Sequence, residues 1–315
     1  MPSEFELIAR YFTRQPGDDA VLVGVGDDCT LLQPAPGRCL AVSVDTSVVD
    51  VHFPATAPAF AIGYRALAVS LSDLAAMGAE PRWCLMALTL ETAGDPWLSE
   101  FSRGFYELCQ QTEVSLVGGD ITRGRLSIGV TVHGELPPGQ ALRRSGARAG
   151  DILAVTGSLG GGYGGLVAWQ SGERNLDDPL LGKYLLPRPR VEAGVVLRSL
   201  ATSAIDVSDG LLADLQHLCD ASNVGATLDV AALPLTQGLV ERLGPSEAQR
   251  AALGGGDDYE LLVSLPAASL DEACQRLAEQ GLALTPIGRF DETPGVRGVP
   301  DTLPAGWLHF QGETP

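Results

Sequence analysis

Basic residues and histidines are scarce in this sequence. Its 315 residues include 21 Lys and Arg against 39 Asp and Glu, which gives a formal net charge of −18, and only four His. Binding to nucleic acid needs a basic face that neutralises phosphates, so this balance argues against a nucleic-acid partner. With so few histidines and no G-x-S-x-G motif, the sequence also offers no convincing nucleophile–base–acid triad.

Paired cysteine motifs and long apolar runs are also missing. None of the six cysteines forms CxxC, and no Cys/His cluster has zinc spacing, so we expect reduced, mostly buried thiols. No run of about 18 uncharged apolar residues occurs, and the N-terminal MPSEFELIARYF carries acids without a clean apolar core. We therefore predict no membrane span, no signal peptide, no membrane partner and a cytoplasmic location.

Hydrophobic residues make up 45% of the chain, which is ample for two globular domains. A stretch at 134–150 rich in Gly, Pro and Arg predicts the junction, so we expect domains at 1–137 and 138–315. Periodicity predicts helices at Glu4–Arg14, Ala59–Met77, Trp97–Gln111, Leu166–Gln170, Asp209–Ala221 and Leu270–Gln280. It predicts strands at Ala20–Val25, Cys39–Val44, Trp83–Leu90, Val114–Val117, Leu126–Gly134, Asp151–Thr156, Ala204–Val207, Thr227–Val230, Tyr259–Ser264 and Thr285–Arg289.

Aspartates recur where apolar segments end. In four segments an apolar run is followed or joined by Gly or Ser together with Asp: VLVGVGDDC, SVDTS, VSLVGGD and AIDVSDGL. Such positions gather outside the carboxyl ends of strands in open α/β folds, and clustered carboxylates are the usual ligands of Mg²⁺. The alternative is that they lie in turns or cap helices, as Asp commonly does. The candidates are Asp27, Asp28, Asp45, Asp120, Asp206 and Asp209.

Asp73 lies in an unusually apolar helix. Within AIGYRALAVSLSDLAAMG, Arg65 is the only other charged residue. A buried carboxylate is costly unless it is paired or bound to a metal, so Asp73 is a candidate ligand. The alternative is an exposed position near the end of the helix, where the helix dipole disfavours an acid slightly.

The glycine-rich stretch TGSLGGGYGGL at 156–166 matches G-x-G-x-x-G only formally. The acidic residue that a dinucleotide site needs about 20 positions later is absent, and there is no GK[ST] of a P-loop. We therefore predict a tight turn here, and one interpretation is that this turn approaches a bound phosphate.

Four further residues have both a functional and an ordinary interpretation. His52 is either a site residue or a surface or packing histidine. Arg123 and Arg144 are candidates to bind phosphate groups, and the alternative is that each is a solvated charge on a loop. Ser208, between Asp206 and Asp209, is a candidate cap for the helix that follows.

Seven blocks, taken in order, resemble the thiamine-monophosphate kinase family over nearly the whole chain. The family belongs to a wider superfamily that includes aminoimidazole ribonucleotide synthetase and selenophosphate synthetase. The blocks are GDDCTLL, SVDTSV with HF, ALAVSLSDLAAMGAEP, LVGGDITRG, RSGARAGD, AIDVSDGLLADL and GGGDDYEL.

The resemblance implies an aminoimidazole ribonucleotide synthetase-like architecture, with an N-terminal α/β domain that dimerises through its sheet and a C-terminal α+β domain. It implies Mg²⁺-assisted transfer of a phosphoryl group from ATP to thiamine phosphate by a homodimer, giving thiamine diphosphate and ADP. The implied Mg²⁺ positions are Asp28, Ser43, Val44, Asp45, Asp73, Asp120, Asp206 and Asp209, with Asp28, Asp73, Asp120 and Asp209 as the catalytic set. The implied nucleotide positions are Tyr106, Gly119, Asp120, Arg144 and Ser208, and the implied substrate positions are His52, Asp257 and Trp307.

Two positions depart from the family pattern. Val44 stands where the family often has Thr, so only its backbone carbonyl can serve a metal. Asp257 stands where Glu is common, which shortens that side chain by one methylene. Two rival functions remain open: another ATP-dependent synthetase of the superfamily, and a non-catalytic regulator that binds nucleotide or metal.

Overall fold

The computed structural model describes residues 3–14, 18–92 and 94–299, and Trp307 therefore lies outside the described residues. The described chain divides into two compact units. The first lies within Met1–Leu74 and Ala79–Ala141, and the second within Ala75–Gly78 and Leu142–Pro315. The division after Ala141 falls inside the junction that the glycines, prolines and arginines of 134–150 predict.

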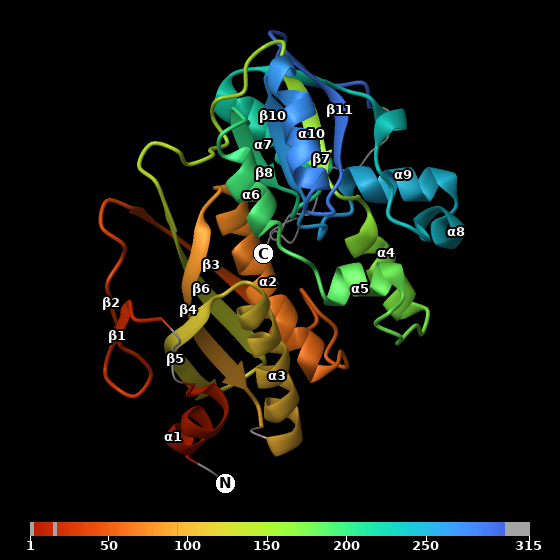
Figure 1. Ribbon diagram of the computed structural model, residues 1–315. Helices are drawn as coiled ribbons and strands as arrows, with labels where there is room; N and C mark the ends of the chain where they lie inside the picture. The colour runs from red at the N-terminus through yellow and green to blue at the C-terminus, as the bar shows by residue number, and fades with distance from the viewer. Residues whose placement is uncertain (1–2, 15–17, 93, 300–315) are drawn as a thin grey trace, which may run out of the picture. The chain divides into compact units, whose positions relative to one another are not determined.

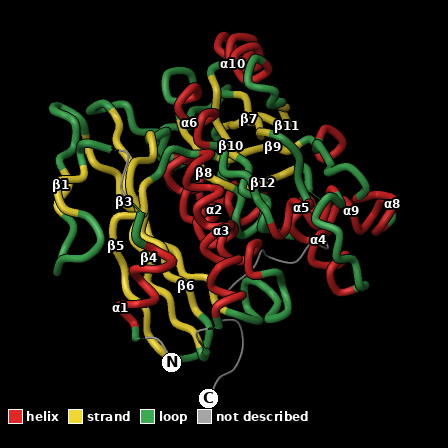
Figure 2. Tube along the Cα trace, turned by 60° about the horizontal axis from the view of Figure 1, so that its bottom comes forward, coloured by secondary structure: helices red, strands yellow, loops and turns green. Residues whose placement is uncertain are grey.

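The first unit is built on a four-stranded sheet with the order β3-β6-β4-β5, in which only β4 and β5 run parallel. Along β4, Met86 and Leu88 are buried, whereas Ala87 between them is exposed. Figures 1 and 2 show α2 and α3 along one side of these strands. The elements are α1 (Glu4–Leu7), η1 (Ile8–Phe12), β1 (Val21–Val23), β2 (Leu31–Leu32), β3 (Cys39–Val48), α2 (Ala59–Ala76), β4 (Glu80–Leu90), α3 (Asp95–Gln111), β5 (Ser115–Arg123) and β6 (Ser127–Leu136).

Helix α2 is long and apolar enough to cross a bilayer by length and composition, and it is the one such helix in the described chain. Most of it is buried within the fold, with Leu67, Leu71 and Leu74 at most 1% exposed. A core helix passes the same test as a membrane span, and the burial identifies α2 as a core helix.

The second unit contains a six-stranded sheet with the order β12-β9-β11-β7-β10-β8, antiparallel except for β12 with β9. The strands are β7 (Ile152–Thr156), β8 (Ser203–Asp206), β9 (Gly225–Leu228), β10 (Leu261–Leu265), β11 (Leu284–Asp291) and β12 (Gly295–Arg297). The helical segments are α4 (Gly161–Gln170), α5 (Pro179–Leu185), α6 (Val191–Leu197), α7 (Leu211–Ser222), η2 (Val230–Ala232), α8 (Leu239–Leu243), α9 (Pro245–Gly254), η3 (Ala267–Ser269) and α10 (Leu270–Ala278).

Both faces of this second sheet are buried. Leu153 and Val155 of β7 point into a core with Leu215 of α7, whereas Ala154 between them joins a core with Leu277 of α10. Figure 1 shows α10 lying against the sheet. Because both faces are covered, these strands are apolar throughout, and the sequence shows them as continuous apolar runs.

Two local predictions are corrected by the structure. The glycine-rich stretch is only partly a turn, because α4 already begins at Gly161. Ser208 does not cap the helix that follows: Gly210 occupies the N-cap without a side-chain cap, and Asp214 inside α7 binds the free N–H groups instead.

Candidate functional site

The first group of predicted ligands lies where β3 faces α2. Ser43 and Asp45 are two residues apart on β3, so their side chains share one face, and the Ser43 hydroxyl donates a hydrogen bond to Asp73 of α2. Burial and the nearby Asp73 carboxylate raise the pKa of Asp45 to about 6, against a hydrogen bond from Ser70 that lowers it. Two carboxylates held this close favour a shared cation.

Val44 points the other way. It lies between Ser43 and Asp45, and its side chain is 63% exposed on the opposite face of β3. Only its backbone lies beside the carboxylates, in agreement with the limited role that its side chain allows.

The second group lines a pocket of about 610 Å³ beside β5. Asp27 and Asp28 come from the turn after β1, and Gly119 and Asp120 come from β5. The carboxylate of Asp27 accepts the backbone N–H of Asp28 at 2.8 Å, so the two adjacent acids have different surroundings.

Asp120 lies inside β5 and Asp45 lies inside β3, rather than after the strands as the sequence suggested. The reason is the mainly antiparallel sheet, which has no single carboxyl edge. Strands β3 and β5 are separated by β6 and β4, a distance of about 14 Å at ~4.8 Å per step. One Mg²⁺, with ligands at about 2 Å, cannot join these two groups within one chain.

The third group lies in the second unit, around the loop between β8 and α7. Asp206 ends β8, and Ser208 and Asp209 follow in the loop. The buried Asp214 accepts the backbone N–H groups of Ser208, Asp209 and Gly210 at 3.1, 3.2 and 3.2 Å. Burial, with the charges of Asp206 and Asp209, raises the pKa of Asp214 to about 8.

Each of the three groups thus has few candidate ligands of its own. Among the described residues, no set of three or more His, Cys, Asp or Glu side chains lies close enough to hold a metal ion unaided. The donors present are carboxylate and hydroxyl oxygens, which fit Mg²⁺ and leave positions for water or phosphate oxygens.

The comparisons with known proteins decide the family. The family models described as AIR synthase related protein, N-terminal domain and C-terminal domain, match residues 26–136 and 148–300. A curated thiamine-monophosphate kinase of Escherichia coli (strain K12) is 44% identical over 301 residues, covering 94% of this chain and 92% of that protein. The chain belongs to the thiamine-monophosphate kinase family.

Solved structures agree with this membership. The crystal structure of thiamine-monophosphate kinase from Stenotrophomonas maltophilia K279a is 46% identical, with a TM-score of 0.88 over 94% of this chain and 96% of that one. A structure described as AaThiL complexed with AMPPCP and TMP is 30% identical, with a TM-score of 0.79 over 88% and 89% of the two chains. The two-domain aminoimidazole ribonucleotide synthetase-like architecture is confirmed.

In this family member, the predicted substrate residue Asp257 lies in a strained loop. Asp257 and Tyr259 both have positive φ, at 64° and 51°, and the Tyr259 hydroxyl donates to Asp257 at 2.8 Å. The Asp257 N–H donates to the carbonyl of Ser208 at 2.8 Å, so the loop that contains Asp257 and the loop of the third group are joined by a backbone hydrogen bond. Left-handed conformations outside Gly are costly and often mark functional loops.

The two acids that flank Tyr259, Asp258 and Glu260, were not predicted as site residues. Asp258 accepts the N–H groups of Gly160 and Gly162 at 2.8 and 3.1 Å. Glu260 is fully buried and binds Lys183 at 2.7 Å and Arg190 through two oxygens. Burial alone would raise the pKa of Glu260, but the two cations outweigh it and lower that pKa.

The remaining predicted residues have varied surroundings. Tyr106 is buried, its hydroxyl donates to the carbonyl of Phe12 at 2.8 Å, and the guanidinium of Arg14 lies 3.6 Å from its ring centroid. Tyr106 lines a different hollow from the one with Asp28 and Asp120. His52 is half-buried and accepts the Val48 N–H through Nδ1, and Arg144 is exposed.

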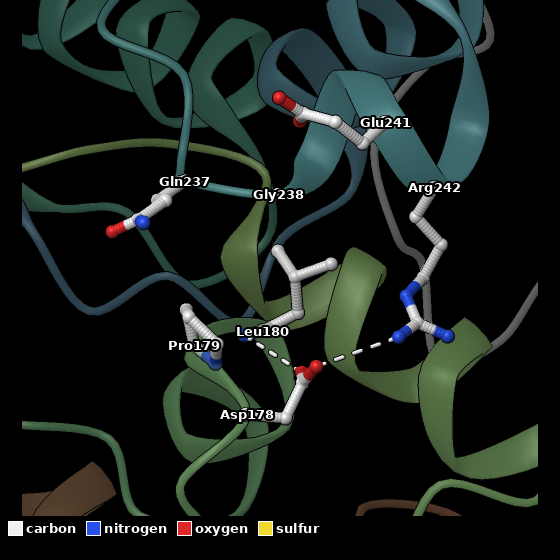
Figure 3. A pocket seen from close by; sticks show the side chains of 7 residues that line it. All are labelled: Asp178, Pro179, Leu180, Gln237, Gly238, Glu241 and Arg242. Carbon is white, nitrogen blue, oxygen red and sulfur yellow. Dashed lines mark hydrogen bonds and ion pairs between the residues drawn. The ribbon is translucent and has the colours of Figure 1, made fainter.

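A further pocket of about 400 Å³ in the second unit has a structural explanation (Figure 3). Asp178 caps α5 by accepting the N–H groups of Leu180 and Leu181, and it pairs with Arg242 at 3.4 Å. Asp178 is thus engaged by the start of α5 and by Arg242, unlike the carboxylates of the three groups above.

Proposed function

We propose that this protein transfers the γ-phosphoryl group of ATP to thiamine phosphate, giving thiamine diphosphate and ADP. The observation that carries the proposal is the end-to-end match to thiamine-monophosphate kinases, which extends to a structure described with AMPPCP and TMP. The three carboxylate groups agree with it, because phosphoryl transfer needs mainly positioning and charge neutralisation.

The chemistry makes few demands on the protein's own groups. The nucleophile is an oxygen of the substrate phosphate, whose second pKa is about 6, so it is mostly ionised at pH 7 and needs no general base. Asp28, Asp120, Ser43, Asp45, Asp73, Asp206 and Asp209 would hold Mg²⁺. Bound Mg²⁺ supplies neutralisation of the repulsion between the phosphate and the triphosphate. Asp257, with its oxygen oriented by Tyr259, would lie beside the positively charged thiazolium ring.

A homodimer is part of the proposal. Leu40, Val42 and Val44 alternate along β3 and are 47%, 55% and 63% exposed, which leaves a row of apolar side chains on one face of an edge strand. By the strand registers, Asp120 shares a face with Thr46, two residues beyond Val44. A second copy seated on this face would lie beside Asp120 and close a site that one chain leaves open. We also expect a cytoplasmic location.

Incubation of the pure protein with ATP, Mg²⁺ and thiamine phosphate tests the activity. We expect equal amounts of thiamine diphosphate and ADP, and no product from folded, Mg²⁺-supplied protein would overturn the proposal. Asp73→Asn and Asp120→Asn should lower kcat by at least 100-fold, whereas the exposed Asp177→Asn should not change it. A panel of ribonucleotide amides tests the synthetase rival, and ATP binding without any turnover would favour the regulator.

A further inference from the structure

The loop that contains Asp257 combines backbone strain with burial. Asp257 itself is half-buried, whereas its neighbours in the range 256–260 are buried. Asp257 and Tyr259 both have positive φ, at 64° and 51°. A strained conformation of this kind persists in a residue other than Gly only where the surrounding structure fixes it. The contacts of the neighbouring residues therefore decide where the Asp257 carboxylate lies.

Glu260 anchors the end of this loop. Its two carboxylate oxygens accept hydrogen bonds from Thr156 at 2.8 Å, from Lys183 at 2.7 Å and from two nitrogens of Arg190. A carboxylate has about four acceptor positions, and these hydrogen bonds fill them. Glu260 is therefore not free to bind a ligand, and its contacts join the loop to β7, to α5 and to the start of α6.

The two cations come from one short stretch of chain. Lys183 lies in α5, which Figure 1 shows beside α4, and Arg190 is the N-cap residue of α6. The stem of Lys183 packs on the first turn of α4, since a Cβ on Gly161 would lie 2.9 Å from the Cβ and Cγ of Lys183. The side chains of Lys183 and Arg190 are 24% and 14% exposed, so both charges are largely withdrawn from water.

Stability alone does not account for such a cluster. Desolvation of buried charges offsets much of their attraction, and apolar side chains of similar volume often stabilise a core equally well. The cluster adds direction, because the planar guanidinium of Arg190 fits a carboxylate in a fixed orientation. Asp258 is held as well, by the N–H groups of Gly160 and Gly162. The residues after Asp257 are thus fixed in place by directional contacts.

We propose that Lys183 and Arg190 are positioning residues for thiamine phosphate: by holding Glu260, they set the direction in which Asp257 faces the substrate. They act through the loop and not by contact with the substrate. The identity of the substrate rests on the proposed function.

Loss of the Lys183 charge tests the proposal. In Lys183→Met the stem remains and Arg190 still pairs with Glu260. We expect the KM for thiamine phosphate to rise by about tenfold, the effect of one misaligned charged contact, with kcat and the KM for ATP unchanged. Lys183→Arg should restore the KM, and Arg190→Lys, which keeps the charge and loses the planar fork, should raise it. Arg242→Met is the matched control, because Arg242 is 28% exposed and pairs with Asp178 in the same unit.

Amide hydrogen exchange follows the loop itself and needs no substrate. The N–H groups of Asp257 and Tyr259 donate to the carbonyls of Ser208 and Val207, both at 2.8 Å. These two amides should exchange about tenfold faster in Lys183→Met, because the loop opens locally, while the amides of α10 keep their native rates. If Lys183→Met does not fold, Lys183→Gln, which keeps a hydrogen-bond donor without the charge, takes its place with the same expected results.

Three outcomes overturn the proposal: an unchanged KM for thiamine phosphate in the folded Lys183 variant, an equal rise in the KM values of both substrates, or faster exchange throughout the second unit. If the native protein makes no thiamine diphosphate, the proposed function fails. The exchange rates of Asp257 and Tyr259 still decide, in that case, whether Lys183 holds the loop.

Discussion

At the scale of single residues, the buried acids show how strongly surroundings set ionisation. Asp258 and Glu260 are two positions apart and both are buried, yet burial raises the pKa of Asp258 to about 7, whereas the pKa of Glu260 is lowered. The difference is that Glu260 contacts two cations, while Asp258 accepts two backbone N–H groups. Neutral hydrogen-bond donors offset less of the desolvation of a carboxylate than full charges do.

Asp258 should make stability depend on pH. Its pKa of about 7 in the folded state lies above its ordinary value of 3.8, so the folded state binds the proton more tightly. The stability it contributes is full below pH 4 and is lost as pH rises through 7, by up to about 4 kcal/mol. Urea unfolding with a chelator present should show this fall, to which Asp214 and Asp45 add because their pKa values are also raised, and Asp258→Asn should make the fall smaller. Parallel pH profiles for the two proteins would contradict the prediction.

Gly119 should not tolerate a side chain. A Cβ at this position would lie 1.9 Å from the carbonyl oxygen of Met86, which is backbone and cannot turn aside. We expect Gly119→Ala to displace β5, to lower stability by about 1–3 kcal/mol and to weaken ATP binding. Thermal melts and ATP titrations measure both effects. Gly94→Ala is the control, because a Cβ there meets no atom within 4 Å; equal behaviour of the two variants would refute the argument.

At the scale of elements, short loops are held by acids that lie in or beside helices. Asp214, in the first turn of α7, accepts hydrogen bonds from the three backbone N–H groups of Ser208–Gly210. Asp258 does the same for the start of α4, where the glycines allow close contact: a Cβ on Gly162 would lie 2.5 Å from the carbonyl oxygen of Asp257. The glycines at the start of α4 therefore allow it to pack closely against the loop that contains Asp257 and Asp258.

Loss of the Asp214 contacts should change the dependence on Mg²⁺. Asp214→Ala leaves the N–H groups of Ser208, Asp209 and the buried Gly210 without their acceptor, so this loop loses three of its contacts. Residues that orient metal ligands typically matter by 10–100-fold in metal affinity, and we expect the Mg²⁺ concentration for half-maximal activity to rise by about that factor. The exposed Asp220→Asn on the same helix should leave it unchanged. An unaltered Mg²⁺ titration in a folded Asp214→Ala protein would rule out this role.

At the scale of the whole molecule, the first unit carries two of its candidate carboxylates on strands that lie far apart in the sheet. Asp45 and Asp120 lie on edge strands of one sheet and point to opposite faces, by the register of β3, β6, β4 and β5. One chain alone therefore does not bring them together. The apolar row on β3 lies on the face that Asp120 shares, and it gives the physical reason to expect a second copy on that face.

A charge on that row should separate the proposed dimer. Val42→Glu and Val44→Glu place carboxylates in an apolar contact, where their desolvation is costly. Sedimentation velocity should show a dimer for the native protein and a shift toward monomer for the variants, with kinase activity falling in parallel. Val240→Glu, partly exposed in the second unit, should remain dimeric. Variants that stay dimeric and active would show that β3 is not the contact surface.

Long periodic segments could be predicted from the sequence, because their pattern is local. The predicted helices Ala59–Met77 and Trp97–Gln111 correspond closely to α2 and α3, and the strand Leu126–Gly134 to β6. Helices α5, α6, α8 and α9 and strand β12 were not predicted. They are short, at three to ten residues, so their apolar periodicity is too brief to read, and tertiary packing decides their form.

The sequence by itself determined the family, because seven ordered motifs carry that information without any folding. It also singled out the candidate metal ligands, since an acidic residue next to an apolar segment can be recognised from the sequence alone. Only the tertiary structure decided which acids lie together: Ser43, Asp45 and Asp73 on one side of the sheet, Asp28 and Asp120 in a pocket beside β5. It also revealed Asp214, Asp258 and Glu260 as supports. The reason is strand order and register, which long-range packing sets and no local pattern encodes.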